Sequence, residues 1–186
     1  MPLRRSDVDT DQIIPSDWLK RVERTGFGAG LFAEWRKQPE FVLNQPRHSG
    51  ATILVAGENF GTGSSREHAV WALQDYGFRA VISPRFGDIF RNNAYKGGLL
   101  PVELDATDVD TLMTAVEVQP ATEVTVDLID REVRYAERTV EFAVDDYVRQ
   151  RLLSGLDDIG GTLQHDREIA AFEQARSHWL PTTTAG

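Results

Sequence analysis

The chain has 186 residues, with 29 acidic and 20 basic side chains, a formal net charge of −9 at pH 7 and no cysteine. This acidic balance argues against a nucleic-acid-binding surface, and the lack of thiols excludes disulfides and any iron–sulfur cluster bound by the chain itself. No apolar stretch approaches the length of a membrane span and no signal peptide follows Met1, so a cytoplasmic protein is expected.

The first predicted elements surround an acidic motif near the N-terminus. Residues 7–11 are expected to form a polar turn, followed by a short strand at Ile13-Ile14. A calcium loop is excluded, because Gln12 stands where such a loop needs glycine and Trp18 stands where it needs a bidentate glutamate. The motif therefore has no metal-binding role in this prediction.

Residues 18–35 contain three glycines between aromatic and leucine side chains, which indicates mobility. Within this stretch, Leu31, Phe32 and Trp35 fit one face of a short helix. That spacing predicts ordinary packing in the core.

The strongest pattern in the chain lies at residues 53–77. The run Ile53-Leu54-Val55-Ala56 is typical of a buried strand, and a glycine-rich turn follows it. Apolar residues then recur at helical spacing from Ala69 to Tyr76, and Gly77 ends the pattern. The stretch predicts a strand, a glycine loop and a helix.

The start of that helix has two interpretations. Loop amides and the positive end of the helix dipole favour an anion, and Ser64, Ser65 and Arg66 add hydroxyls and a guanidinium, which together suit a carboxylate. The same residues, followed by Glu67, also fit a capping box. A dinucleotide site is excluded because Arg66 stands where the third glycine of that fingerprint belongs.

The second half of the chain predicts a parallel α/β layer followed by extra strands. The expected strands are 79–83, 99–104, 122–127, 132–136 and 139–144. The expected helices are 86–95, a helix capped by Asp105 or Thr107 that ends near 118, 145–153 and 166–179. We expect a single domain with C-terminal helices over residues 1–180 and a mobile tail at 181–186.

Several motifs resemble one known family. The decapeptide Phe60-Gly61-Thr62-Gly63-Ser64-Ser65-Arg66-Glu67-His68-Ala69 resembles the signature of the swivelling domain of the aconitase superfamily. Further segments resemble the small subunits of bacterial 3-isopropylmalate dehydratases, namely Asp9-Thr10-Asp11-Gln12-Ile13-Ile14-Pro15, Arg24-Thr25-Gly26-Phe27-Gly28, Gly87-Asp88-Ile89-Phe90, Leu99-Leu100-Pro101-Val102 and Gly155-Leu156-Asp157-Asp158-Ile159-Gly160. The resemblance covers nearly the whole chain and implies an α/β fold, the swivelling β/β/α domain with a C-terminal helical extension. Compared with that family, the first strand at Pro2-Leu3 is short.

The resemblance also implies a reaction. It implies a hydro-lyase subunit that interconverts 2- and 3-isopropylmalate through 2-isopropylmaleate in leucine biosynthesis, active only with a large subunit whose [4Fe–4S] cluster acts as Lewis acid on the substrate hydroxyl. By position in the motif, Ser64 is the base, and Arg66 holds a substrate carboxylate with Ser65 as a neighbouring donor. A helix N-terminus and loop amides in a site closed to water would lower the pKa of a hydroxyl there. No cofactor or metal is assigned to this chain.

Other residues enter through the same resemblance. Asp9, Asp11, Gly61 and Gly63 are expected to support the site. The region after the Asp-Thr-Asp motif is expected to recognise the side chain of the substrate. The candidates for that role are Lys20, Arg21, Arg24, Leu31 and Phe32. The basic residues would suit a further carboxylate, whereas the apolar ones would suit an isopropyl group.

Three alternatives stay open. The same chemistry on homoaconitate or a methylated malate would need only a different recognition loop. A stand-alone serine hydrolase is disfavoured, because Gly61-Thr62-Gly63-Ser64-Ser65 is not a Gly-x-Ser-x-Gly elbow and no histidine partner is evident. A non-catalytic carboxylate-binding module would need only the helix start and Arg66.

Overall fold

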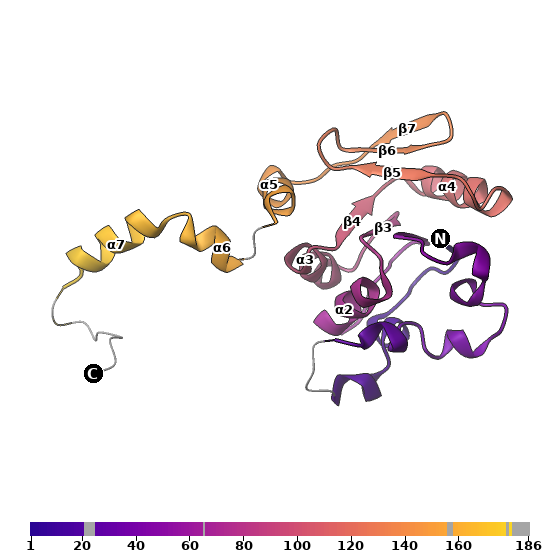
Figure 1. The fold of residues 1–186 in the computed structure, drawn as a ribbon, viewed down its shortest axis with the longest axis horizontal. Coiled ribbons are helices and arrows are strands. Elements are labelled where there is room, and N and C mark those ends of the chain that lie inside the picture. The colour runs from indigo at the N-terminus through magenta and orange to yellow at the C-terminus, as the bar shows by residue number, and fades with distance from the viewer. Residues whose placement is uncertain (21–24, 65, 156–157, 178, 180–186) are drawn as a thin grey trace.

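A computed structural model describes residues 1–20, 25–64, 66–155, 158–177 and 179. The chain forms a four-stranded sheet in the order β1-β2-β3-β4 and a three-stranded sheet in the order β5-β6-β7 (Figure 1). The first sheet is parallel throughout and the second is antiparallel. This arrangement confirms the predicted α/β class with a second, β-rich layer.

The parallel sheet is built from short, mostly apolar strands. They are β1 (Pro2–Leu3), β2 (Ile53–Ala56), β3 (Ala80–Ser83) and β4 (Leu100–Glu103). Helix α2 (Glu67–Tyr76) connects β2 to β3, and helix α3 (Asp88–Gly97) connects β3 to β4. The predicted strands and helices of this half are therefore confirmed to within about two residues at most ends.

Helix α4 (Ala106–Val118) lies between the two sheets (Figure 1). The antiparallel sheet consists of β5 (Val124–Asp127), β6 (Glu132–Tyr135) and β7 (Arg138–Glu141). Leu112 and Met113 of α4 share one hydrophobic core with Val133 of β6 and with Phe142. The same core contains Ile82 and Val102, so α4 joins the two sheets through apolar packing.

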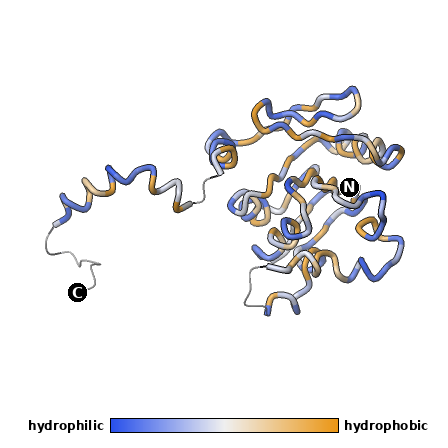
Figure 2. Tube along the Cα trace, viewed as in Figure 1, coloured by the Kyte–Doolittle hydropathy of each residue, from blue (hydrophilic) through white to orange (hydrophobic). Residues whose placement is uncertain are grey.

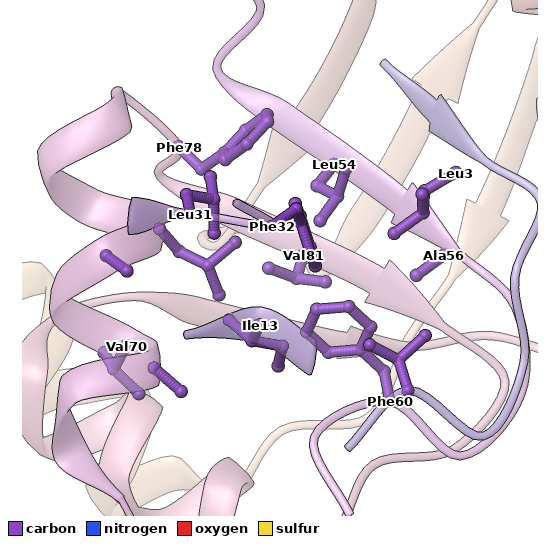
Figure 3. Packing of buried hydrophobic residues seen from close by; sticks show 14 of the residues in the cluster. Leu3, Ile13, Leu31, Phe32, Leu54, Ala56, Phe60, Val70, Phe78 and Val81 are labelled. Carbon is purple, nitrogen blue, oxygen red and sulfur yellow. The ribbon is translucent and has the colours of Figure 1, made fainter. Parts of the chain in front are cut away.

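The opposite face of the parallel sheet covers a second core. Phe32 and Leu31 are fully buried there and pack with Ile13, Phe60 and Val81 (Figure 3). Short elements carry the chain across this face, namely α1 (Thr10–Ile13) and the 3₁₀ helices η1 (Ser16–Lys20), η2 (Phe27–Gly30), η3 (Trp35–Lys37), η4 (Val42–Asn44) and η5 (Pro46–His48).

Two predictions for this region were wrong. Ile13 lies in α1 instead of a strand, because Asp9 and Gln12 form a capping box that starts a helix there. Leu31, Phe32 and Trp35 do not share one helix either, since Phe32 adopts a positive φ of 48° that interrupts it. The prediction that they pack in the core is confirmed for Leu31 and Phe32, and Trp35 stacks on the ring of Phe32.

The C-terminal part is helical. Helix α5 (Asp146–Ser154) starts as predicted at Asp145, whose carboxylate accepts hydrogen bonds from the N–H groups of Tyr147 and Val148. Helices α6 (Asp158–Leu163) and α7 (Asp166–Ala175) follow. Helix α6 was not predicted, and α7 ends four residues before the predicted end at 179. The mobile tail predicted at 181–186 lies outside the described residues. Among the described residues, no helix combines the length and apolar character that spanning a membrane requires.

Candidate active site

The glycine loop after β2 is bound to the acidic motif that follows β1. The carbonyl of Val8 accepts hydrogen bonds from the N–H groups of Gly61 at 2.7 Å and Thr62 at 3.1 Å. In return, the N–H of Thr10 donates to the carbonyl of Thr62 at 2.9 Å. Two segments that are more than 50 residues apart in the chain thus meet at one edge of the parallel sheet.

The loop after β3 joins the same edge. The N–H of Phe60 donates to the carbonyl of Arg85, and the N–H of Gly87 donates to the carbonyl of Phe60, both at 2.9 Å. The loops that leave the carboxyl ends of three neighbouring strands therefore converge. In open α/β sheets this is the edge at which ligands bind.

Two glycines make that convergence possible. Gly61 has a φ of +76°, and a Cβ atom there would lie only 2.6 Å from Cβ of Phe90. A Cβ atom on Gly87 would lie 2.5 Å from the carbonyl oxygen of Gly61. The backbone approach at this point leaves no room for a side chain, which explains why glycine occupies both positions.

Ser64 lies at the exposed end of the glycine loop. Its carbonyl oxygen accepts a hydrogen bond of 3.0 Å from Oγ1 of Thr10, a side chain that is buried. The hydroxyl of Thr10 thus fixes the backbone of Ser64 while the side chain of Ser64 stays open to solvent.

Arg66, and not Ser64, is the N-cap residue of α2, and the Arg66 side chain makes no capping hydrogen bond. The predicted capping box at residues 64–67 was therefore wrong. Gly63 has a φ of +88°, and Thr10 anchors Ser64, so the loop carries Ser64 outside the helix. The capping box of the structure lies at α1 instead, where Asp9 accepts a 2.8 Å hydrogen bond from the N–H of Gln12.

The guanidinium of Arg66 forms an ion pair with Asp11, from Nη1 to Oδ1. The Arg66 side chain is 18% exposed and that of Asp11 is 54% exposed. An arginine has five N–H donors, so a pair made through Nη1 leaves other donors for a second anion. Ser64 and Arg66 therefore present a hydroxyl and a cation at the same sheet edge.

Comparison with known proteins places these features in a family. One matching family profile is described as the aconitase C-terminal domain and covers residues 1–107; the other is described as the C-terminal domain of the 3-isopropylmalate dehydratase small subunit and covers residues 158–185. The 3-isopropylmalate dehydratase small subunit of Parafrankia sp. (strain EAN1pec) is 68% identical over 183 residues, which are 98% of this chain and 94% of that protein. The chain belongs to the 3-isopropylmalate dehydratase small-subunit family. The small subunit of Acidothermus cellulolyticus is also 68% identical, over 185 residues that cover 100% of this chain and 94% of the relative.

A solved structure extends the likeness within this small-subunit family. The crystal structure of 3-isopropylmalate dehydratase from Methanocaldococcus jannaschii superimposes with a TM-score of 0.67 at 28% identity, and the match covers 92% of this chain and 96% of that one. The expected swivelling domain of the aconitase superfamily is thereby confirmed as the fold.

The structure brings together only part of the predicted site of the small subunit. Gly61, Gly63 and Ser64 lie on the glycine loop, Asp9 and Arg66 are the N-cap residues of α1 and α2, and Asp11 lies in the first turn of α1. Leu31 and Phe32 have no exposed surface and belong to the core. Lys20 is exposed and forms an ion pair with Asp17 at 3.3 Å. Ser65, Arg21 and Arg24 lie outside the described residues, so their roles stay predictions.

Thr10 is a candidate site residue that the sequence did not indicate. It lies between the two aspartates of the motif, and both its N–H and its hydroxyl hold the glycine loop. No local pattern indicates this role, because the acceptor on Ser64 is 54 residues away in sequence. The tertiary structure alone identifies it.

Proposed function

We propose that this chain interconverts 2- and 3-isopropylmalate through 2-isopropylmaleate as the small subunit of a two-subunit hydro-lyase. The observation that carries the proposal is the joint position of Ser64 and Arg66 on a loop that Thr10 and Asp11 hold from the neighbouring segment. Family membership at 68% identity over nearly the whole chain supports the same reaction.

In this proposal, Ser64 is the base. The Oγ alkoxide of Ser64 takes the proton from the carbon next to a substrate carboxylate, and the hydroxyl on the neighbouring carbon leaves as water with a proton that the large subunit would supply. Re-addition of water to the double bond in the opposite sense completes the isomerisation, and the proton returns from Ser64. The loop amides and the N-terminus of α2 favour the charged form of the serine, but only where water is excluded.

The exposure of Ser64 supports the need for a partner. A hydroxyl in contact with bulk water has no useful basicity at neutral pH, and Ser64 is exposed in this chain. A large subunit that covers the sheet edge would exclude water and strengthen the interactions of Ser64 and Arg66 with the substrate. We therefore place the closed active site between the two subunits.

Arg66 binds a substrate carboxylate in the proposed complex. Its guanidinium is partly buried and already oriented by Asp11, so its remaining N–H groups face a defined direction. Charge-assisted hydrogen bonds from arginine to a carboxylate are short and often paired, which fixes the substrate relative to Ser64. Ser65 is proposed as a further donor.

The iron–sulfur cluster of the expected enzyme does not fit the residues of this chain. Such clusters are held by cysteine thiolates, and the chain has no cysteine. Departure of the substrate hydroxyl also needs an acid that Ser64 and Arg66 do not supply. We therefore assign the [4Fe–4S] cluster to the large subunit, where it would supply the Lewis acid for the departing hydroxyl.

The experiment that tests the proposal is anaerobic reconstitution with the large subunit from the same source. The complex is assayed with 2-isopropylmalate, homocitrate and a methylated malate, and the unsaturated products are followed by ultraviolet absorbance. We expect turnover of isopropylmalate by the complex and none by either subunit alone. Turnover of homocitrate alone would move the proposal to a homoaconitase-type enzyme, and activity without the large subunit would overturn the two-subunit mechanism.

A further inference from the structure

The last two helices carry large apolar side chains into solvent. Ile159 and Leu163 of α6, Phe172 of α7 and Trp179 are each between 61% and 74% exposed. We call residues 158–177 and 179 the C-terminal arm. Figure 2 shows hydrophobic and hydrophilic residues side by side along it, the pattern of an amphipathic segment.

The arm lacks the packing that normally stabilises such helices. No residue of α7 is buried, and in Figure 1 α6 and α7 lie apart from both sheets. An open cavity of about 540 Å³ between α5 and α6 is lined by residues such as Tyr147 and His165. Because helices shorter than roughly 12–15 residues are marginal in water on their own, the arm needs a surface to pack on.

The family profiles distinguish the arm from the first part of the chain. The profile that matches residues 1–107 is described as the C-terminal domain of aconitase, which is a part of a longer chain. The arm falls instead in residues 158–185, matched by a profile of the small subunit. A domain that is joined to its partner in one chain meets that partner at an effective concentration of about millimolar or more. A separate subunit lacks this link and needs additional direct contacts to bind.

We propose that the C-terminal arm is a docking element that binds an apolar groove on the large subunit. This inference rests on the proposed function, in which the active site is completed by the large subunit. Covered aromatic side chains bury ~150–250 Å² each, so Phe172 and Trp179 with Ile159 and Leu163 offer on the order of 500 Å². That is more than half of the ~800 Å² that each partner contributes to a standard interface.

The polar residues of the arm suit the same role. Asp166, Arg167, Glu168 and Glu173 are exposed on α7, around the apolar Phe172. An apolar centre with a charged rim is the usual composition of a protein–protein interface. The arm therefore adds affinity away from Ser64 and Arg66, and it takes no part in the chemistry.

The test compares full-length variants for binding to the purified large subunit. Leu163→Ser and Phe172→Ser remove one apolar side chain each, and Ile129→Ser is the matched control, because Ile129 is 65% exposed in the turn after β5. Dissociation constants are measured by calorimetry under anaerobic conditions. We expect each arm variant to raise Kd about 10-fold or more and the control to leave it unchanged.

A second readout separates docking from catalysis. At saturating large subunit, both arm variants should recover the kcat of the wild type, because their active-site loops are intact. A different result is that the arm variants bind the large subunit with the Kd of the wild type while the wild-type complex is active on isopropylmalate. That result would overturn this inference and leave the proposed function standing. Loss of self-association in the arm variants, with unchanged Kd for the large subunit, would assign the arm to a second copy of the chain instead. Failure of the wild type to bind the large subunit would overturn both proposals.

Discussion

Arg66 and Asp11 form an ion pair across 55 residues of sequence. The partners differ in exposure, since the Arg66 side chain is 18% exposed and the Asp11 side chain is 54% exposed. A pair of this kind contributes only about 0–1 kcal/mol to folding stability. Its main consequence is orientation, because Asp11 fixes one edge of the flat guanidinium, and we propose that the other N–H groups of Arg66 bind the substrate.

Replacing Asp11 with Asn tests that orientation. The amide keeps the shape but loses the charge that holds Arg66, so we expect KM for isopropylmalate in the reconstituted enzyme to rise about 10-fold while kcat changes less. The melting temperature should move little, because the pair is partly exposed. A lower KM would show instead that Asp11 competes with the substrate for Arg66.

Replacing Ser64 with Ala removes the proposed base. Loss of a general base costs roughly 10²–10⁴ in rate, so turnover should fall by at least about 100-fold. Folding and binding of the large subunit should persist, because the hydrogen bond from Thr10 ends on the carbonyl of Ser64 and survives the change. Ser49→Ala, at another exposed serine, is the control in the same assay, with circular dichroism of both variants. Turnover like that of the wild type would move the base to another residue.

Thr10 offers a test of how the serine is positioned. Thr10→Val keeps the volume of this buried side chain but leaves the carbonyl of Ser64 without its donor. We expect kcat to fall about 10-fold and stability to fall by about 1–3 kcal/mol. Thr10→Ser restores the hydroxyl and should restore kcat. If Thr10→Val retains full kcat well below its melting temperature, the bond serves folding alone.

Local pattern was enough to predict much of this fold. Apolar runs and glycines located β2, α2, β3, α3, β4 and α4 in order, and Asp145 was correctly placed at the start of α5. These predictions hold because strand and helix periods depend on nearby residues. The candidate site residues Ser64 and Arg66 were predicted from the resemblance of one contiguous motif to a known family, and their roles stay predictions.

The errors came from contacts between distant segments. The sequence at residues 64–67 fits a capping box. In the structure, however, Thr10 binds the carbonyl of Ser64, and Arg66 is the N-cap residue. Leu31 and Phe32 fit either a core or a ligand pocket by composition; their burial confirms the core packing, and their role in substrate recognition stays a prediction. The pairing of Arg66 with Asp11 has no signature in either motif taken alone.

The antiparallel sheet contains a carboxylate whose charge depends on the fold. Asp127 accepts hydrogen bonds from the N–H of Asp130 and from the guanidinium of Arg134, and these hold its pKa below the ordinary value of 3.8. A lowered pKa in the folded state contributes stability that is present above about pH 4 and is lost as pH falls through the folded-state value. Asp127→Asn removes this titration.

The difference in unfolding free energy between the wild type and Asp127→Asn should therefore shrink as pH falls below about 4. Urea denaturation at several pH values measures it. Glu137→Gln removes one negative charge from the next turn of the same sheet and controls for net charge. A difference that stays constant from pH 7 to pH 3 would contradict the role of the Asp127 carboxylate.

Gly61 and Gly50 form a matched pair that separates backbone strain from steric overlap. Their φ angles are +76° and +77°, but a Cβ atom on Gly50 would meet nothing within 4 Å, whereas one on Gly61 would overlap Phe90. Gly50→Ala should cost about 1 kcal/mol, from the left-handed backbone alone. Gly61→Ala should cost a further ~1–3 kcal/mol and should lower turnover as well, because relief of the overlap moves the loop that carries Ser64. Thermal and urea unfolding measure the loss of stability, and the reconstituted assay measures the loss of turnover. Equal losses of stability at the two positions would contradict the close approach of the glycine loop to α3.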